Sequence, residues 1–189
     1  DRIRSMIGLK NWNRNYALVA DDPTKPFQAA WVVLYDAVDR GKLYVVIALD
    51  PSHSQSERSC PRGLVAVGAE VVTGARYLLD ATLDHATPMQ IVERLFRWHA
   101  RWRAQRIVIE SNGGYALFAP LIIQQQQSRG LWLPVTFQPH KLAKEIRIEA
   151  LAPAFEQGMW RFPRIQNAGV KALLDEFCAY PEGFRDGPD

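Results

Sequence analysis

Two acidic residues in this chain of 189 residues each follow a short apolar run. Asp50 ends the run Val-Val-Ile-Ala-Leu-Asp, and Glu110 ends the run Ile-Val-Ile-Glu. A buried carboxylate is costly unless a partner neutralises it, and two adjacent carboxylates repel each other unless a cation lies between them. Carboxylate oxygens in motifs without a lysine are ligands that suit Mg²⁺ or Mn²⁺. The pair therefore indicates a divalent-metal site.

Acidic residues near the end of the sequence are available to complete such a site, namely Asp186 and Asp189. Two divalent ions about 3.5–4 Å apart, bridged by acids of this kind, activate a water and stabilise the leaving oxygen of a phosphodiester. Asp50 alone also has a structural interpretation, because Asp-Pro-Ser after a strand is usually a turn in which the Asp side chain binds backbone amides. The order and spacing of the two acids together favour the metal site.

The elements that would position these acids are two strands. Residues 43–49 are predicted to form a fully buried strand, and residues 107–110 a second one. In an open α/β sheet, reactive groups gather outside the carboxyl ends of parallel strands. If the two strands are parallel neighbours, Asp50 and Glu110 meet at one edge of the sheet.

The rest of the chain predicts a mixed α/β pattern. Thr73-Gly74 is expected to form the turn of an antiparallel hairpin, and Thr87-Pro88 to begin a helix with Thr87 as its N-cap. Residues 28–39 fit either a strand or a helix, and we favour a helix. The other predicted helices cover 115–127, the segment from His140 to Pro153, and 168–179, and the other predicted strands cover 63–72, 75–80, 131–137 and 159–162.

Composition narrows the class of protein. The chain is 48% hydrophobic and 23% charged, which is ordinary for a soluble globular domain. Its two distant cysteines exclude a disulfide framework and a cysteine-based zinc site, and they indicate a reducing compartment. No apolar run reaches the roughly 18 residues of a membrane span, and no nucleotide-binding P-loop motif occurs. The net charge of +3 is compatible with a polyanionic partner.

Four segments, in order, resemble the nuclease domain of the large terminase subunit of tailed bacteriophages. The resemblance covers about residues 43–189 and implies a ribonuclease-H-like fold, with a central mixed sheet of five or more strands flanked by helices. It implies a nuclease domain at 41–189 and a lead-in or linker region at 1–40. The four segments are Asp50-Pro-Ser, Ile-Val-Ile-Glu110-Ser-Asn-Gly-Gly, Lys144-Glu-Ile-Arg147-Ile with Ala-Pro-Ala-Phe-Glu-Gln-Gly158, and Tyr-Pro-x-Gly-Phe-Arg-Asp186-Gly-Pro-Asp189.

Carried over by position, the resemblance implies that Asp50, Glu110 and Asp186 are catalytic metal ligands, with Asp189 as a further candidate. Arg185 stands where the family usually has the first of two adjacent aspartates.

Three basic residues are candidates for DNA binding: Lys141, Lys144 and Arg147. Lys144 and Arg147 share one face of the predicted helix, where they would hold DNA phosphates or brace the acids. The alternative is an ordinary solvated helix face.

We therefore expect a metal-dependent endonuclease domain that cuts concatemeric double-stranded viral DNA during genome packaging, with two Mg²⁺ or Mn²⁺ ions. The family implies an ATPase motor domain of the same full-length protein, the portal and the small terminase subunit as partners. It implies that the protein acts in the host cytoplasm and does not bind a membrane. Two alternatives remain open: another ribonuclease-H-like nuclease, of the Holliday-junction resolvase or transposase type, and a non-catalytic DNA-clamping module.

Overall fold

A computed structural model describes residues 25–51, 62–111, 114–139 and 142–181. A seven-stranded sheet forms its centre, in the order β1-β7-β4-β3-β2-β5-β6. The strands are β1 (Val33–Tyr35), β2 (Leu43–Asp50), β3 (Arg62–Glu70), β4 (Arg76–Asp84), β5 (Arg106–Glu110), β6 (Val135–Gln138) and β7 (Trp160–Pro163). The helices are η2 (Ala29–Trp31), η3 (Arg40–Lys42), α3 (Pro88–Trp102), α4 (Gly114–Arg129), α5 (Lys144–Glu149), α6 (Ala152–Glu156) and α7 (Ala168–Ala179).

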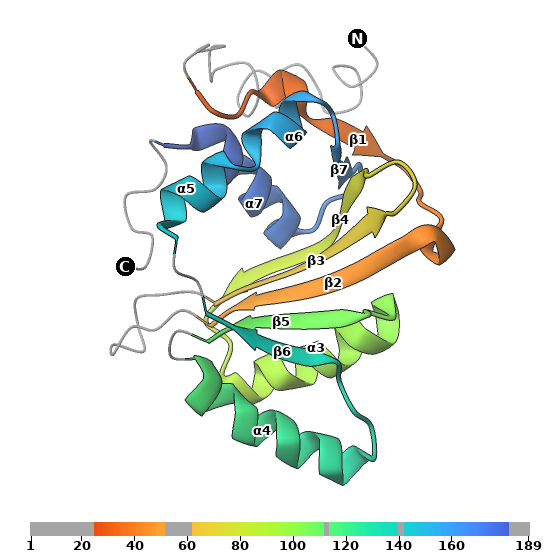
Figure 1. Cartoon of the computed structure of the whole chain (residues 1–189), viewed down its shortest axis with the longest axis vertical. Helices are drawn as coiled ribbons and strands as arrows, with labels where there is room; N and C mark the ends of the chain where they lie inside the picture. The colour runs from red at the N-terminus through yellow and green to blue at the C-terminus, as the bar shows by residue number, and fades with distance from the viewer. Residues whose placement is uncertain (1–24, 52–61, 112–113, 140–141, 182–189) are drawn as a thin grey trace.

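The sheet is mixed, because β3 runs antiparallel to both β2 and β4 while the other neighbouring strands pair in parallel. The helices form two groups around it (Figure 1): α3 and α4 pack beside β2, β5 and β6, and α5, α6 and α7 lie near β4 and β7. Each group has its own apolar core. Ile47, Leu95 and Ile107 belong to the first core, and Phe162 and Leu174 to the second. The expected α/β sheet flanked by helices is confirmed.

Strand β2, inside the sheet between β3 and β5, shows why the acids lie where they do. Leu43, Val45, Ile47 and Leu49 are buried in the core beneath α3 and α4. The intervening residues belong to the opposite face of the sheet, because side chains alternate along a strand. That face is only partly covered, and Tyr44 on it is 45% exposed. The predicted strand is confirmed, but the expectation that it is fully buried is wrong.

The hairpin and the first long helix follow their sequence signals. Gly74 has a φ of +73° in the turn between β3 and β4, a backbone conformation that favours glycine. Thr87 caps α3, its side chain accepts from the Gln90 amide, and the Gln90 side chain accepts in return from the Thr87 amide. Pro88 occupies the first helical position, where no amide hydrogen is needed. Both predictions are confirmed.

Three segments correct the sequence predictions. Residues 28–39 do not form the expected long helix. They contain the three-residue 3₁₀ helix η2 and then β1, which gains parallel backbone pairing with β7. In the described part of the segment from His140 to Pro153, the structure has two short helices, α5 and α6, instead of the one expected helix. Pro153 has no amide hydrogen with which to continue the hydrogen bonding of α5, and it lies in the first turn of α6. The strand expected at 131–137 is confined to β6. In the described residues, no helix is long and apolar enough to cross a membrane.

The described residues before 40, which are 25–39, pack against α6 and α7 and add one strand to the sheet. Phe27 is 3% exposed, and its ring centroid lies 5.0 Å from the ring centroids of both Phe155 and Phe177. Strand β1 extends the same seven-stranded sheet. The division between a lead-in at 1–40 and a domain at 41–189 stays a prediction.

Helix α7 approaches β4 so closely that only glycine fits at one position. A Cβ at Gly169 would overlap the Ala81 carbonyl and lie 2.8 Å from the Thr82 Cα. We therefore expect Gly169→Ala to lower the free energy of unfolding by about 1–3 kcal/mol in urea titrations, because backbone atoms on both sides must move. Gly63→Ala is the matched control, since a Cβ there meets its neighbours at 3.9 Å. Equal urea midpoints for the two variants would contradict this packing.

Candidate metal centre

Asp50 and Glu110 occupy adjacent positions on neighbouring parallel strands. β2 pairs with β5 in the register Ala48↔Val108 and Leu49↔Ile109, and each acid is the next residue of its strand. Adjacent strands lie about 4.8 Å apart. The prediction that the two strands are parallel neighbours is confirmed, and their ends meet at the edge on the left of Figure 1.

Both acids belong to the same face of the sheet. Leu49 and Ile109, at 2% and 0% exposure, are buried in the core beneath α3 and α4. Because side chains alternate, Asp50 and Glu110 are directed to the other face. Asp50 is exposed, and the Glu110 side chain is 20% exposed. Two carboxylates thus share one solvent-accessible corner of the sheet, where a cation would relieve their repulsion.

A glycine leaves one side of this corner without a side chain. Gly63 on β3 is the pairing partner of Asp50, and a Cβ built on it would lie 3.9 Å from the Asp50 Cβ. It would lie equally far from Leu83 on β4, a side chain that is 44% exposed. Glycine within a strand often marks a place where another backbone or a ligand comes close. Sequence reasoning missed Gly63, although its place at the start of a predicted strand was a usable signal.

Helix α5 brings a cation to the acid pair. One terminal nitrogen (Nη1) of Arg147 lies 3.8 Å from Glu110 Oε2, and the two side chains are 34% and 20% exposed. The Nε of Arg147 is buried and has no hydrogen-bond acceptor within the described part of the chain. An arginine fork has five donors, so this guanidinium retains donors for a further anion.

One helical turn earlier, Lys144 is half-buried near α7. Burial raises the pKa of the Glu176 carboxyl on α7, and the charge of Lys144 acts in the opposite direction. The two predicted DNA-binding residues in α5 are thus placed beside the acid pair and beside α7. Lys141, the third, lies outside the described residues, as do Asp186 and Asp189.

The donor chemistry of the corner fits a hard divalent cation. Asp50 and Glu110 offer only carboxylate oxygens, the ligands that Mg²⁺ and Mn²⁺ prefer. Within the residues that the structure describes, no third histidine, cysteine or acid joins them to make a group that could hold a metal. A full coordination sphere therefore needs further oxygens, from water, from substrate or from acids such as Asp186.

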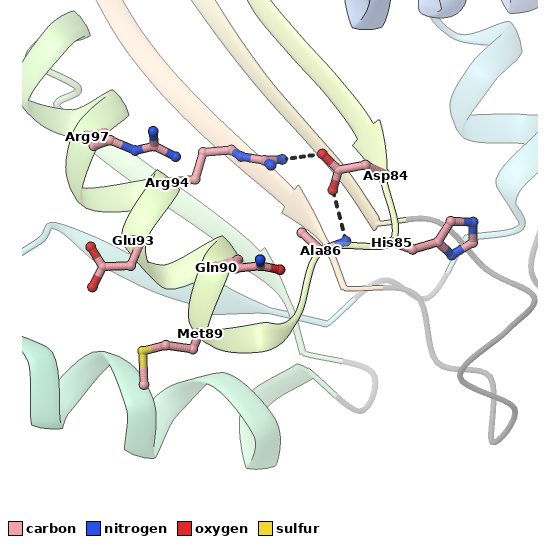
Figure 2. Close-up of a pocket in the computed structure, with 8 residues that line it drawn as sticks. All are labelled: Asp84, His85, Ala86, Met89, Gln90, Glu93, Arg94 and Arg97. Carbon is pink, nitrogen blue, oxygen red and sulfur yellow. Dashed lines mark hydrogen bonds and ion pairs between the residues drawn. The ribbon is translucent and has the colours of Figure 1, made fainter.

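A second feature of the same edge lies on the α3 side of the sheet. An open hollow of about 520 Å³ is lined by residues of the β4 end and of α3 (Figure 2). Arg94 crosses it to place its guanidinium 2.8 Å from Asp84, and it also donates to Thr82 Oγ1 at 2.8 Å. Asp84 in turn accepts from the Ala86 amide. These contacts tie α3 to β4, so Asp84 has a structural role apart from the acid pair.

Comparison with known proteins identifies the family. Residues 47–183 match the sequence model of the family described as the terminase RNaseH-like domain. This chain belongs to that family. The terminase match includes Asp50, Glu110 and α5 but ends before Asp186 and Asp189. Among curated proteins, no sequence matches this terminase domain.

Solved structures of terminase nuclease domains share this fold. The human cytomegalovirus terminase nuclease domain has a TM-score of 0.56 at 15% identity, over 76% of this chain and 78% of that one. A manganese-soaked, inhibitor-bound structure of the cytomegalovirus domain scores 0.53 at 16% identity, over 76% and 80%. The P22 large terminase nuclease domain scores 0.53 at 11% identity, over 77% and 71%. The expected ribonuclease-H-like fold is thereby confirmed.

Proposed function

We propose that this terminase RNaseH-like domain is a metal-dependent endonuclease that cuts concatemeric double-stranded viral DNA during genome packaging. Asp50, Glu110 and Asp186 would hold two Mg²⁺ or Mn²⁺ ions, with Asp189 as an additional ligand. The observation that carries the proposal is the register that sets Asp50 beside Glu110 on one face of the sheet. The manganese-soaked cytomegalovirus domain supports the choice of metal.

The ions would supply an activated water and charge stabilisation for the leaving 3′ oxygen. The chain itself contributes position and access. Asp50 and Glu110 are fixed by two rigid, paired strands, which suits a site that must hold its ligands within a narrow geometry. The bare surface at Gly63 leaves room for a DNA strand beside Asp50. Arg147 lies where it could contact a phosphate next to the one being cut.

The wider assembly follows from the family resemblance alone. The partners proposed are duplex DNA, an ATPase motor domain of the same full-length protein, the portal and the small terminase subunit, and the place of action is the host cytoplasm.

Metal removal tests the proposed chemistry first. Plasmid DNA is expected to stay intact with this domain in EDTA, and cutting is expected to return when excess Mn²⁺ or Mg²⁺ is added, because the acids act only with a cation between them. Gel electrophoresis of the plasmid over time gives the readout. Cutting that persists in EDTA would contradict the metal-dependent mechanism. No cutting with any divalent ion would favour the DNA-clamping module, and a preference for four-way junctions over linear duplex would favour a resolvase.

Arg147 has two possible roles at this site, and its variants separate them. If it holds DNA, we expect Arg147→Gln to raise the KM for duplex about tenfold with a smaller change in kcat, because a phosphate contact is lost in both ground and transition states. Arg147→Lys restores the charge without the fork and should recover part of the affinity. Steady-state cleavage kinetics provide both constants. A fall in kcat at constant KM would instead mean that Arg147 braces Glu110.

A further inference from the structure

The edge of the sheet opposite the acid pair is strongly basic. Six cationic side chains lie where β2, β4 and β5 begin or in the segments that lead into these strands, and all six are exposed. We call this surface the basic edge. Its residues are Arg40, Lys42, Arg76, Arg101, Arg103 and Arg106.

Strand pairing gathers these residues although they are far apart in the sequence. Lys42 precedes β2, and Arg106 opens β5, where it pairs with Val46 of β2. Arg76 opens β4 and pairs with Ala69, whose other neighbour is Tyr44 at the start of β2. In Figure 1 the starts of β2 and β5 lie on the right, across the sheet from the edge that carries the acids.

Two of the cations are fixed by one buried aromatic ring. The guanidinium carbons of Arg40 and Arg101 each lie 4.6 Å from the ring centroid of Trp102, which is 8% exposed. Such cation–π contacts orient a guanidinium while its N–H donors stay available to an anion. Ordered donors lose less entropy when they bind than mobile ones do. This edge is therefore partly preorganised for anions.

Few acids offset this charge. Asp39 lies 3.8 Å from Lys42, and Glu70 ends β3. Asp80 is buried, where it receives a hydrogen bond from Asn167 and lies 3.5 Å from Arg101. Arg103 and Arg106 make no ion pair with any described residue. A net positive strip remains, and a repeating polyanion matches it.

We propose that the basic edge is a second contact surface for the phosphate backbone of duplex DNA, separate from the catalytic edge. This proposal rests on the proposed function, because its partner is the same duplex. β2 separates the two edges by roughly 25 Å. Bases along one strand of duplex DNA are about 3.4 Å apart, so this distance corresponds to roughly 7 base pairs. The basic edge thus holds duplex phosphates several base pairs away from the one being cut.

The test compares two double variants of the full chain with equal loss of charge. Arg103→Gln/Arg106→Gln removes two cations from the basic edge, and Arg164→Gln/Lys171→Gln removes two cations that follow β7 or lie on α7. Affinity for a fluorescent 30-base-pair duplex is measured in EDTA, where no cutting occurs, over a range of salt concentrations. The first variant is expected to bind about tenfold more weakly at ~0.1 M salt and to reduce the slope of log K against log salt by about 2. The second should change affinity less than twofold.

Either of two binding results overturns the proposal. Equal losses in both variants would mean that only overall charge matters, and no loss in the first would mean that the edge serves another partner, such as an acidic protein surface. Circular dichroism and thermal melting confirm folding. Cutting of a 12-base-pair duplex with Mn²⁺ separates the two proposals: the basic-edge variant should match the unmutated chain, and a parallel loss would place the edge within the cleavage site. If no chain cuts, the proposed function fails while the binding result stands.

Discussion

Asp50→Asn is expected to lower the rate of duplex cleavage by at least about a thousandfold. An amide keeps the shape of the side chain but removes one anionic ligand of the cation. A bound cation contributes several kcal/mol of transition-state stabilisation, and losing that stabilisation corresponds to about a thousandfold in rate. The measurement is a single-turnover cleavage assay of linear duplex with Mn²⁺. The fold should persist, because Asp50 is exposed at the end of β2 and the apolar contacts of that strand lie before it.

Asp175→Asn is the matched control for this result. Asp175 is exposed on α7 and belongs to neither of the strands that carry the acid pair, so the same chemical change there should leave the cleavage rate within about twofold. A cleavage rate of Asp50→Asn that equals that of the unmutated domain would remove Asp50 from the mechanism. Equal losses in both variants would point to an effect of net charge.

Glu110→Gln is expected to cause a loss of similar size, and the double variant with Asp50→Asn should cut hardly more slowly than either single variant. Residues that act as one unit are strongly non-additive, since removing either member already disables the whole. The register between β2 and β5 makes such a unit of these two acids. Single-turnover rates of both single variants and the double variant give the coupling directly.

The exposed Glu156, at the end of α6, provides the control substitution Glu156→Gln. A double-variant rate near the product of the two single losses, about a millionfold below that of the unmutated domain, would mean that Asp50 and Glu110 act independently. That result would contradict a shared cation site.

The acid pair was predictable from the sequence because its signals are local. An apolar run that ends in a carboxylate is visible at 45–50 and at 107–110, and strand length alone places each acid at a carboxyl end. The common face of the two acids required the register, which depends on pairing between strands that are 60 residues apart at Leu49 and Ile109. The structure adds that register. It also shows that Gly63, which has no side chain, lies beside Asp50.

Elements that depend on distant partners were predicted less well. The apolar run before Tyr35 is compatible with a helix or a strand, and the outcome depends on β7, whose paired residues are 128 positions further along the chain. The interruption between α5 and α6 follows from Pro153. The sequence pattern places this proline at the end of one long helix, whereas it lies in the first turn of α6. The basic edge could not be predicted, because its six cations come together only when β4, β3, β2 and β5 lie side by side in this order.

Anomalous diffraction from crystals soaked in Mn²⁺ tests most directly whether Asp50 and Glu110 together hold a divalent cation. We expect a manganese peak between the two carboxylates, within coordinating distance of an oxygen of each, and we expect it to disappear in crystals of Asp50→Asn soaked in the same way. A well-ordered corner with no peak, or a peak bound only by residues elsewhere in the chain, would contradict a cation site shared by the two acids.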